Sequence, residues 1–374
     1  MAEGFDALIV GAGIVGAACA AELAAAGLCV GVLEPGAVGG GATAAGMGHI
    51  VAMDDSPAQL ALTRYSQTLW GELAPSLGAA TEYTRCGTLW VAADAAGMAA
   101  VRLRQERYRQ AGIPGEVLDG PALQEAEPNL RPDLAGGLLV PEDGVLYAPR
   151  AAALLLQRAA DAGARRIRGQ AVGLRQGGAV LPDGSVLGAG VVVVAAGVQS
   201  AELLPELPLR GKKGHLAITD RHPGFIRHQL VEVGYLQSAH AAAGDSVAFN
   251  VQPRPTGQML IGSSRQFDRP GTEVEPAMLA RMLAAACAYL PGLAALSCIR
   301  SWTGMRAATP DDLPLIGPYP GRPGVWLATG HEGLGITTAT GTARLLAAQI
   351  LGRPPAIPAE PYLPARLLGG AAVV

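Results

Sequence analysis

The feature that most restricts the fold lies at the start of the chain, where two strand-like apolar runs flank a glycine-rich turn and an alanine-rich stretch. The first run covers residues 6–10, the glycines are Gly11, Gly13 and Gly16, and the second run, 28–33, ends at Glu34. This is the order of strand, turn, helix, strand and acid in a dinucleotide-binding unit. The first glycine permits a tight turn, the second lets the backbone approach a pyrophosphate, and the third allows close packing of helix on sheet.

The acid and the helix start indicate which dinucleotide would bind. Glu34 lies 18 positions after Gly16, where its carboxylate can accept hydrogen bonds from ribose hydroxyls. The helix that begins at Ile14 and Val15 offers unpaired N–H groups and a partial positive charge to the phosphates. Because a carboxylate repels a 2′-phosphate, the sequence favours FAD or NAD over NADP.

Length, charge and cysteine usage narrow the class of protein. The 374 residues are enough for two domains, and the net charge of −3 without a basic block gives nucleic-acid binding no electrostatic support. Five scattered cysteines without a CxxC pair argue against a disulfide framework or a zinc site, so no metal is expected. No uninterrupted apolar run of about 20 residues is present, so no transmembrane segment is expected. We expect a cytoplasmic protein, with membrane association only through a partner.

The remaining pattern predicts a mixed α/β chain with a discontinuous nucleotide domain. Helices are expected at 56–77, 95–112, 119–127, 149–162, 278–290 and 333–351, and strands at 87–92, 164–172, 191–196 and 325–328, with a hairpin at 179–187. Residues 212–263 hold several strand-like runs and predict a mostly antiparallel second domain. We expect segments 1–80, 145–210 and 303–374 to form the nucleotide domain, and 81–144 and 211–302 to form a substrate domain.

Six segments in order resemble the D-amino-acid oxidase (DAO) superfamily of flavoproteins. They are 11–34, 39–46, 191–197, 209–211, 302–306 with 311–317, and 328–335. The resemblance covers nearly the whole chain and implies an α/β fold with a Rossmann-like, GR2-type FAD-binding domain. A mostly antiparallel β substrate domain that carries helices would complete the molecule. It also implies non-covalent FAD, since no cysteine near the C-terminal turn matches the covalent-flavin cysteine of sarcosine oxidases.

The resemblance implies specific FAD contacts. Glu34 would hold the adenine-side ribose, Thr43 with its neighbours would touch the pyrophosphate, and the backbone of Val172 would contact adenine. The turn before the last long helix would place N–H groups at the pyrimidine edge of the flavin, where a helix N-terminus stabilises negative charge. The expected cofactor-binding residues are Gly11, Gly13, Ile14, Val15, Gly16, Glu34, Gly41, Ala42, Thr43, Gly46, Met47, Gly48, Val172, Ala196, Gly197, Arg306, Gly330, His331, Gly333, Leu334, Gly335, Ile336 and Thr337.

Arg306 is the main expected catalytic-site residue. By resemblance it would pair with a substrate carboxylate, a task that suits the two parallel hydrogen bonds of a guanidinium. The family pattern usually continues with proline, whereas Ala307 follows here, so the local backbone could differ. The alternative is an internal salt bridge of Arg306 with Asp311 or Asp312.

Four further side chains are weaker candidates. His49 is expected near the flavin, with a hydrogen-bonded loop histidine as the alternative, and His331 belongs to the flavin turn but could serve structure alone. Tyr235 and Phe249 fall in the β-rich segment where relatives line the substrate pocket, although an aromatic there could equally be core.

The expected activity is FAD-dependent oxidation of an amino acid or secondary amine, of the D-amino-acid, glycine/sarcosine or hydroxyproline type. A hydride would pass from the α-carbon to flavin N5 and give an imine. The electron acceptor could be O2, a quinone or a partner protein. Two alternatives remain open: an NAD-dependent dehydrogenase, and an FAD-binding subunit of a hetero-oligomeric amino-acid dehydrogenase that depends on partner chains.

Overall fold

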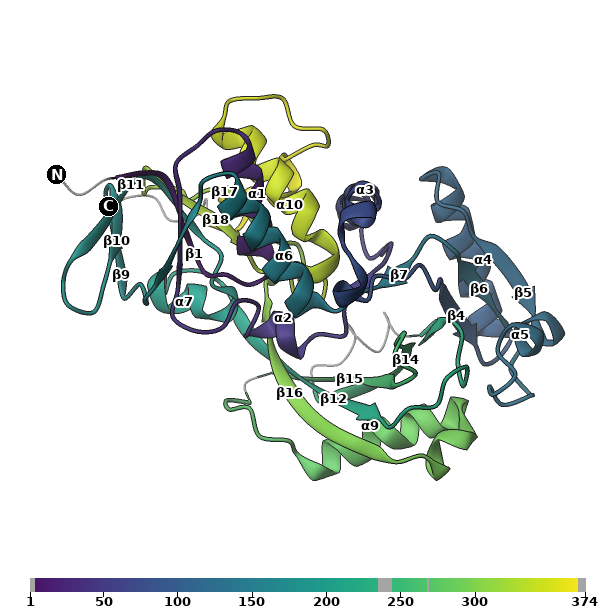
Figure 1. Cartoon of the computed structure of the whole chain (residues 1–374). Helices are drawn as coiled ribbons and strands as arrows, with labels where there is room; N and C mark the ends of the chain where they lie inside the picture. The colour runs from purple at the N-terminus through teal and green to yellow at the C-terminus, as the bar shows by residue number, and fades with distance from the viewer. Residues whose placement is uncertain (1–3, 235–243, 268, 369–374) are drawn as a thin grey trace.

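Two large sheets lie side by side in the chain (Figure 1). The computed structural model describes residues 4–234, 244–267 and 269–368. The first sheet contains the N-terminal strand, and the second contains the β-rich middle of the sequence. Each has its own hydrophobic core, and the segments between 40 and 50 run between them.

The first sheet is largely parallel and is built around the glycine-rich unit. Its order is β17 (Leu315–Pro318), β18 (Val325–Thr329), β11 (Val186–Val194), β1 (Phe5–Val10), β2 (Val30–Glu34) and β8 (Arg165–Arg168). The edge strand β17 is antiparallel, and β9 (Gly173–Arg175) and β10 (Gly178–Val180) extend β11 as a hairpin. Ala7, Leu8 and Ile9 are fully buried because both faces of the sheet are covered.

Three helices pack together on one side of this sheet. They are α1 (Ile14–Ala25), α6 (Ala148–Asp161) and α10 (Gly335–Ile350), and α3 (Pro57–Leu73) packs against α10 (Figure 1). Small residues along α1, such as Ala17 and Ala20, let the helices approach closely. The start of α3 follows from sequence, because Ser56 accepts a hydrogen bond from the N–H of Gln59 (3.1 Å) and proline occupies the first turn.

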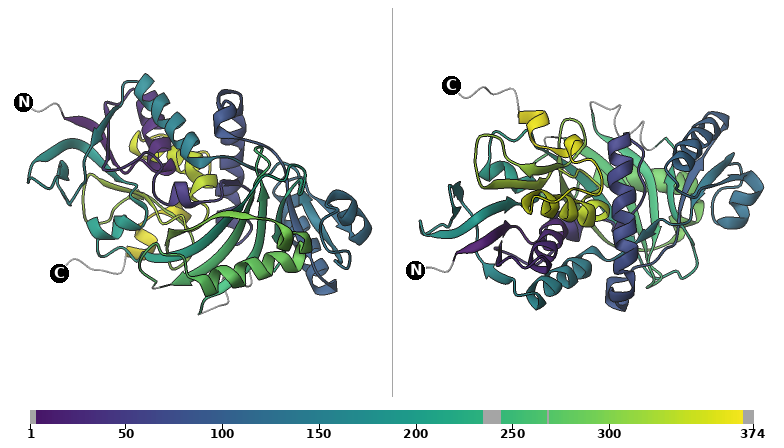
Figure 2. Two further views of the ribbon diagram at one scale, coloured as in Figure 1. Left: turned by 60° about the horizontal axis from the view of Figure 1, so that its bottom comes forward. Right: turned by 90° about the horizontal axis from the view of Figure 1, so that it is seen from above.

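The second sheet is antiparallel except where β13 meets β4. Its order is β16 (Cys298–Ala308), β12 (Arg210–Thr219), β15 (Met259–Phe267), β14 (Ser246–Pro253), β13 (Gln229–Glu232), β4 (Thr88–Ala92), β6 (Gly136–Val140) and β5 (Glu116–Asp119). Helix α9 (Pro276–Tyr289) covers one face, while α4 (Ala95–Gln110) and α5 (Gly120–Ala126) pack at the β5–β6 end (Figure 2).

Alternation along the strands gives the second sheet one apolar and one polar face. Phe249 and Val251 of β14 belong to the same core cluster as Met282 of α9, and Phe249 stacks on Tyr289 with 4.3 Å between ring centroids. Asn250 and Gln252 therefore lie on the opposite face, toward the first sheet. Both are buried, so the space between the sheets is lined with polar side chains.

The predicted fold class is confirmed, and the main differences concern short elements. The glycine-rich segment 36–48 contains one turn of helix, α2 (Ala42–Ala45), and the strand expected at 164–172 ends at Arg168. The small sheet of β3 (His49–Ile50) and β7 (Gly144–Val145), the short helices α7 (Ser200–Leu203) and α11 (Ala365–Leu368), and β5 and β6 were not anticipated. Within the described ranges, no helix is both long enough and apolar enough to cross a membrane.

We propose that the domains follow the two sheets. The boundary expected at residue 303 falls inside β16, which pairs with β12 from Cys298 to Ala308. We therefore place that boundary after Ala308.

Candidate active site

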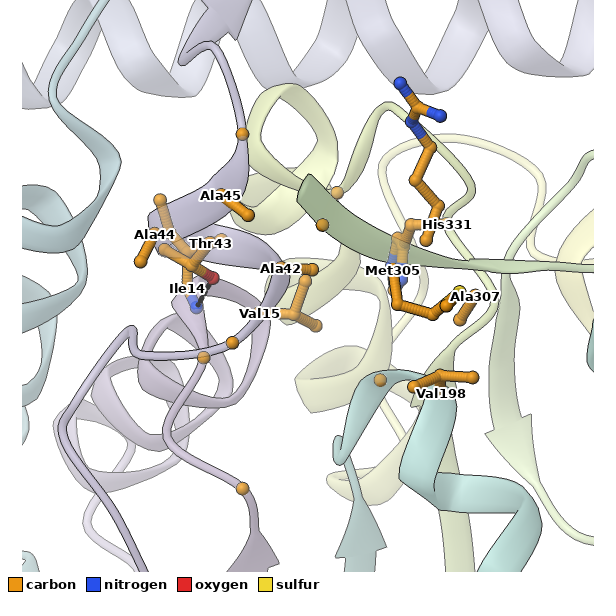
Figure 3. A pocket seen from close by; sticks show the side chains of 18 of the residues that line it. Ile14, Val15, Ala42, Thr43, Ala44, Ala45, Val198, Met305, Ala307 and His331 are labelled. Atoms are coloured by element: carbon orange, nitrogen blue, oxygen red, sulfur yellow. Dashed lines mark hydrogen bonds between the residues drawn. The ribbon is translucent and has the colours of Figure 1, made fainter. Parts of the chain in front are cut away.

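A pocket of about 740 Å³ lies between the two sheets. Its walls come from segments that are far apart in the sequence: the glycine turn, residues 40–49, residues 195–203, β16 and residues 328–336. In Figure 3, Ile14, Val15 and the residues of α2 form one side, and Met305, Ala307, His331 and Val198 form the other.

At one end, the glycine turn and Glu34 form a compact hydrogen-bonded unit. The Glu34 carboxylate accepts hydrogen bonds from the N–H of Ala12 (2.8 Å) and the N–H of Gly36 (2.8 Å). Glu34 itself lines the pocket. Gly11 has φ +106°, and an added Cβ would lie 2.7 Å from the carbonyl oxygen of Ala195. Larger residues are therefore excluded from the turn.

Thr43 joins α2 to the start of α1. Its hydroxyl accepts the N–H of Ile14 (3.0 Å), as the dashed line in Figure 3 shows. Helix α1 has Gly13 as its N-cap, with no side-chain cap and no acid in its first turn. The positive end of α1 therefore faces the pocket without a neutralising carboxylate in that turn, which is the arrangement that binds phosphates.

The turn from Gly330 to Gly335 closes the other end. Gly330 and Glu332 have positive φ values of +77° and +50°, and α10 begins at Gly335 without a side-chain cap. His331 is buried against Thr342, whose hydroxyl lies 3.0 Å from its Nε2. Burial lowers the pKa of His331 to about 3, so its ring is neutral and orders the turn.

Arg306 extends from β16 into the same pocket. Its Nη1 donates to the carbonyl oxygen of Ser264 (3.1 Å), and its guanidinium lies where a side chain on Gly214 would clash, 2.6 Å from the added Cβ. Asp311, one expected internal partner, instead pairs with Arg366 through two contacts of 2.7 and 3.0 Å. The strand continues through Ala307, which pairs with Gly211, so the missing proline leaves β16 regular at this point.

Arg306 interacts electrostatically with Glu332. Lys212 lies 3.0 Å from the Glu332 carboxylate, whose side chain is only 16% exposed. Burial raises the pKa of Glu332, but neighbouring positive charges, led by Arg306 and Lys212, outweigh it and lower that pKa to about 2. Glu332 is therefore an anion at every working pH.

His49 lies where the pocket meets a smaller side cavity. Burial lowers the pKa of His49 to about 4, and the positive charges of Arg306 and Arg254 act in the same direction. Its backbone carbonyl accepts the hydroxyl of Thr337 (2.8 Å), which ties this segment to α10. The imidazole is therefore neutral at physiological pH and available as a hydrogen-bond acceptor.

Most of the expected site residues line this one pocket. They are Gly11, Gly13, Ile14, Val15, Glu34, Gly41, Ala42, Thr43, Gly46, Met47, Gly48, His49, Ala196, Gly197, Arg306, Gly330, His331, Gly333, Gly335 and Ile336.

Several expected residues lie elsewhere. Val172 is half exposed, and its N–H donates to the carbonyl oxygen of Val180. The neighbouring residues Gln170 and Ala171 line the pocket, whereas Val172 does not. Gly16 packs against the Gly11 carbonyl, Leu334 lines the side cavity, and Thr337 is fully buried. Phe249 is in the core on the far face of the second sheet, as its stacking on Tyr289 shows, and Tyr235 falls outside the described residues.

Sequence reasoning missed the polar face of the second sheet. Arg300, Trp302 and Asn250 line the pocket, and Lys212 lines the side cavity. The alternation 300–302–304–306 along β16 could have indicated the first two, because residues two apart share a strand face.

The pocket fits an extended dinucleotide. A side chain at Gly46 would reach within 2.8 Å of Ile336, and one at Gly48 would overlap the carbonyl of Leu146, so both turns need glycine where they border the pocket. A carboxylate at one end, a helix N-terminus in the middle and a second helix start at the other end match the ribose, pyrophosphate and flavin ring of FAD. None of the five cysteines lines the pocket, which agrees with non-covalent binding.

Comparison with known proteins agrees with this geometry. The family described as DAO, FAD dependent oxidoreductase, matches residues 6–349. The chain belongs to the DAO family of FAD-dependent oxidoreductases. It is therefore an FAD-dependent oxidoreductase, so a role limited to NAD is excluded.

The relatives of this DAO-family chain include oxidases and dehydrogenases. Glycine oxidase of Pseudomonas putida is 30% identical over 97% of this chain and 99% of its own length. D-amino acid dehydrogenase 2 of Ralstonia nicotianae is 30% identical over 82% of this chain and 75% of its own. The crystal structure of glycine oxidase from Geobacillus kaustophilus superposes with a TM-score of 0.85 at 27% identity, covering 96% of this chain and 98% of that one.

Proposed function

We propose that this DAO-family enzyme oxidises a small carboxylated amine, an amino acid or a secondary amino acid, at the carbon that bears the nitrogen. One observation carries the proposal: a half-buried guanidinium, Arg306, lies in the same pocket as the turn 330–335 at the flavin end. Similarity to glycine oxidases and D-amino acid dehydrogenases supports the same substrate class.

The chain's own groups would bind and orient the substrate. Arg306 would hold the carboxylate through charge-assisted hydrogen bonds, and neutral His49 would accept a hydrogen bond from the nitrogen. The positive charge of Arg306 disfavours an ammonium ion, which favours the neutral amine that must be present before oxidation. When bound, FAD would supply the two-electron oxidation that converts the amine to an imine.

The segments that would bind FAD and the side chains that would bind the substrate both lie within one chain. This favours activity of the isolated protein over dependence on partner subunits. The test is anaerobic mixing of the FAD-loaded protein with D- and L-amino acids, glycine, sarcosine and hydroxyprolines while the flavin absorbance is followed. Bleaching by at least one carboxylated amine supports the proposal. A flavin that stays oxidised with the whole panel would refute it for the isolated chain.

The acceptor is tested with the reduced protein. Reoxidation by O2 on a catalytic timescale would make the enzyme an oxidase, whereas reoxidation only by a quinone or dye would make it a dehydrogenase.

A further inference from the structure

A side cavity of about 60 Å³ opens beside the main pocket. The two spaces share four lining residues, His49, Asn250, Glu332 and Gly333, so they meet at the end where Arg306 lies. A water-sized group needs roughly 10–15 Å³ of such space. The cavity therefore accommodates the end of a short side chain.

The inner wall of this cavity carries polar atoms without partners. Gln229 of β13 and Trp90 of β4 are each 2% exposed. Among the described residues, neither the Gln229 Oε1 nor the Trp90 indole N–H has a hydrogen-bond partner. The Gln229 amide nitrogen donates to the hydroxyl of Thr88 (3.1 Å), which orients the carbonyl end of the amide as the acceptor that remains.

The junction with the main pocket is formed by Asn250 and His49. Asn250 is 2% exposed, and its side chain is hydrogen-bonded to the imidazole of His49. The polar groups that need a partner are therefore the Gln229 oxygen and the Trp90 indole N–H. Each buried polar group left without a partner costs free energy, so two such groups on one cavity wall indicate a ligand that satisfies them.

The charges of the cavity favour a neutral ligand group. Three carboxylates, Asp55, Asp312 and Glu332, line it together with two cations, Lys212 and Arg265. Lys212 lies 3.0 Å from Glu332 and 3.9 Å from Asp312, so these charges are largely balanced among themselves. A further buried charge would lack its own counter-ion, which is costly.

We propose that the side cavity is a specificity subsite for a neutral hydroxyl or carboxamide group carried by the substrate a few bonds from the oxidised carbon. A hydroxyl or a carboxamide both donates to the carbonyl oxygen of Gln229 and accepts from the indole N–H of Trp90. The inference rests on the proposed amino-acid oxidation and names its preferred substrate class.

The first experiment compares near-isosteric substrate pairs with the FAD-loaded enzyme. Serine against 2-aminobutyrate, asparagine against leucine, and 4-hydroxyproline against proline are tested as both enantiomers by anaerobic flavin reduction. For at least one pair, the hydroxyl or amide member should be favoured in kcat/KM by about tenfold or more, since its apolar counterpart leaves the buried groups unpaired. Equal rates within every pair, as expected if the cavity holds only water, would overturn the proposal. So would a stronger preference for aspartate or 2,4-diaminobutyrate.

The second experiment uses matched variants. Gln229→Met keeps the length of the side chain but removes the unpartnered oxygen, and should reduce the preference by about tenfold. Gln252→Met is the control, because Gln252 is equally buried on the neighbouring strand and both its amide atoms lack a partner among the residues that the structure describes, yet it lines neither cavity. A preference that is unchanged in Gln229→Met, or equally reduced in Gln252→Met, would overturn the assignment.

A binding measurement separates this inference from the proposed activity. 3-Hydroxypropanoate and butanoate cannot be oxidised as amines, and their binding is followed by changes in the visible flavin spectrum. Tighter binding of the hydroxylated acid, lost in Gln229→Met, supports the subsite even if no amine bleaches the flavin. Bleaching by simple amino acids without any preference refutes the subsite alone.

Discussion

Arg306 shares its electrostatic environment with an acid of its own chain. Glu332 is a permanent anion whose pKa is lowered to about 2, and it interacts with both Arg306 and Lys212. A substrate carboxylate must therefore be held by a guanidinium that already has a neighbouring counter-charge. The negative charge of Glu332 weakens the attraction between Arg306 and a carboxylate, which favours release of a carboxylated product.

Replacing Arg306 with methionine should weaken substrate capture specifically. If the guanidinium pairs a buried carboxylate, kcat/KM should fall by about 2–5 kcal/mol in transition-state free energy, measured by anaerobic flavin reduction. Amines without a carboxylate should show little change. Arg322→Met, which removes a surface pair with Glu206 of 2.7 Å, is the control. An equal loss with both kinds of substrate would contradict the role.

Glu34 offers a second test at residue scale. Glu34→Ala removes the acceptor for the Ala12 N–H as well as the ribose contact, so FAD should be lost on dialysis. Glu34→Gln keeps one carbonyl acceptor and should retain more FAD than Glu34→Ala. Flavin occupancy after dialysis measures both, and full occupancy in Glu34→Ala would refute the ribose contact.

His49 predicts an absence of pH dependence. Its pKa of about 4 in the folded protein means that it does not change charge between pH 6 and 9. His49→Gln should therefore lower the rate of flavin reduction without moving the apparent pKa of its pH profile, which the substrate amine would set. A profile whose pKa shifts in the variant would show that His49 titrates in that range.

The site residues that could be predicted from the sequence are those that belong to recognisable motifs. Gly11, Glu34 and Gly330 stand in ordered motifs, and the structure brings all three to one pocket. Asn250, Lys212 and Arg300 belong to no such motif. These residues line the cavities because their face of the strand points toward the first sheet. The apolar residues around them in the sequence do not show which face that is.

At the scale of elements, strand β16 and the short helix α2 form the contact that joins the two sheets at the pocket. The indole of Trp302 donates to the carbonyl of Ala45 (3.3 Å). Beside it, an added Cβ on Gly304 would lie 2.5 Å from the Cβ of Ala45. Glycine at 304 therefore sets how closely α2 approaches the strand.

Gly304→Ala should push α2 away from β16 and reduce FAD retention, as measured by flavin fluorescence during dialysis. Ala45→Gly in the same chain removes the clashing methyl and should restore retention. Gly188→Ala on β11 is the control, since its nearest atom would lie at 3.9 Å. A double variant as poor as Gly304→Ala would show that the contact is not responsible.

At the scale of the whole molecule, Asp143 links three segments that are distant in the sequence: its own turn before β7, the residues after β3, and helix α3. It is fully buried and accepts hydrogen bonds from the N–H of Ala52 (3.0 Å) and the amide of Gln67 (2.7 Å). Burial raises its pKa to about 7 despite these donors. The folded protein therefore holds a proton that the unfolded chain, with an ordinary aspartate, releases above pH 4.

This predicts a pH-dependent stability with a defined sign. Because the pKa is raised on folding, the contribution of Asp143 is most favourable below pH 4 and declines as pH rises to about 7. We expect the Tm of Asp143→Asn, measured between pH 4 and 7, to rise relative to that of the wild type as the pH increases. Asp183 lies on an exposed turn, so the curve of Tm against pH for Asp183→Asn should run parallel to that of the wild type. Parallel curves for Asp143→Asn would contradict the raised pKa.

The long, buried elements of the fold were more predictable from the sequence than its short strands and the ends of its elements. The buried parallel strands and long helices have strong periodicity, and β1, α1 and α10 lie close to where the sequence indicates. The short strands β5 and β6 and the true extent of β16 depend on pairing with distant strands, so local pattern does not define them.

The wall of the pocket formed by residues 330–336 lies more than 300 positions after the glycine turn. A growing chain therefore has the phosphate-binding turn long before it can enclose the coenzyme. Flavin is expected to be captured only after residue 336 has left the ribosome, because until then one side of the pocket is missing.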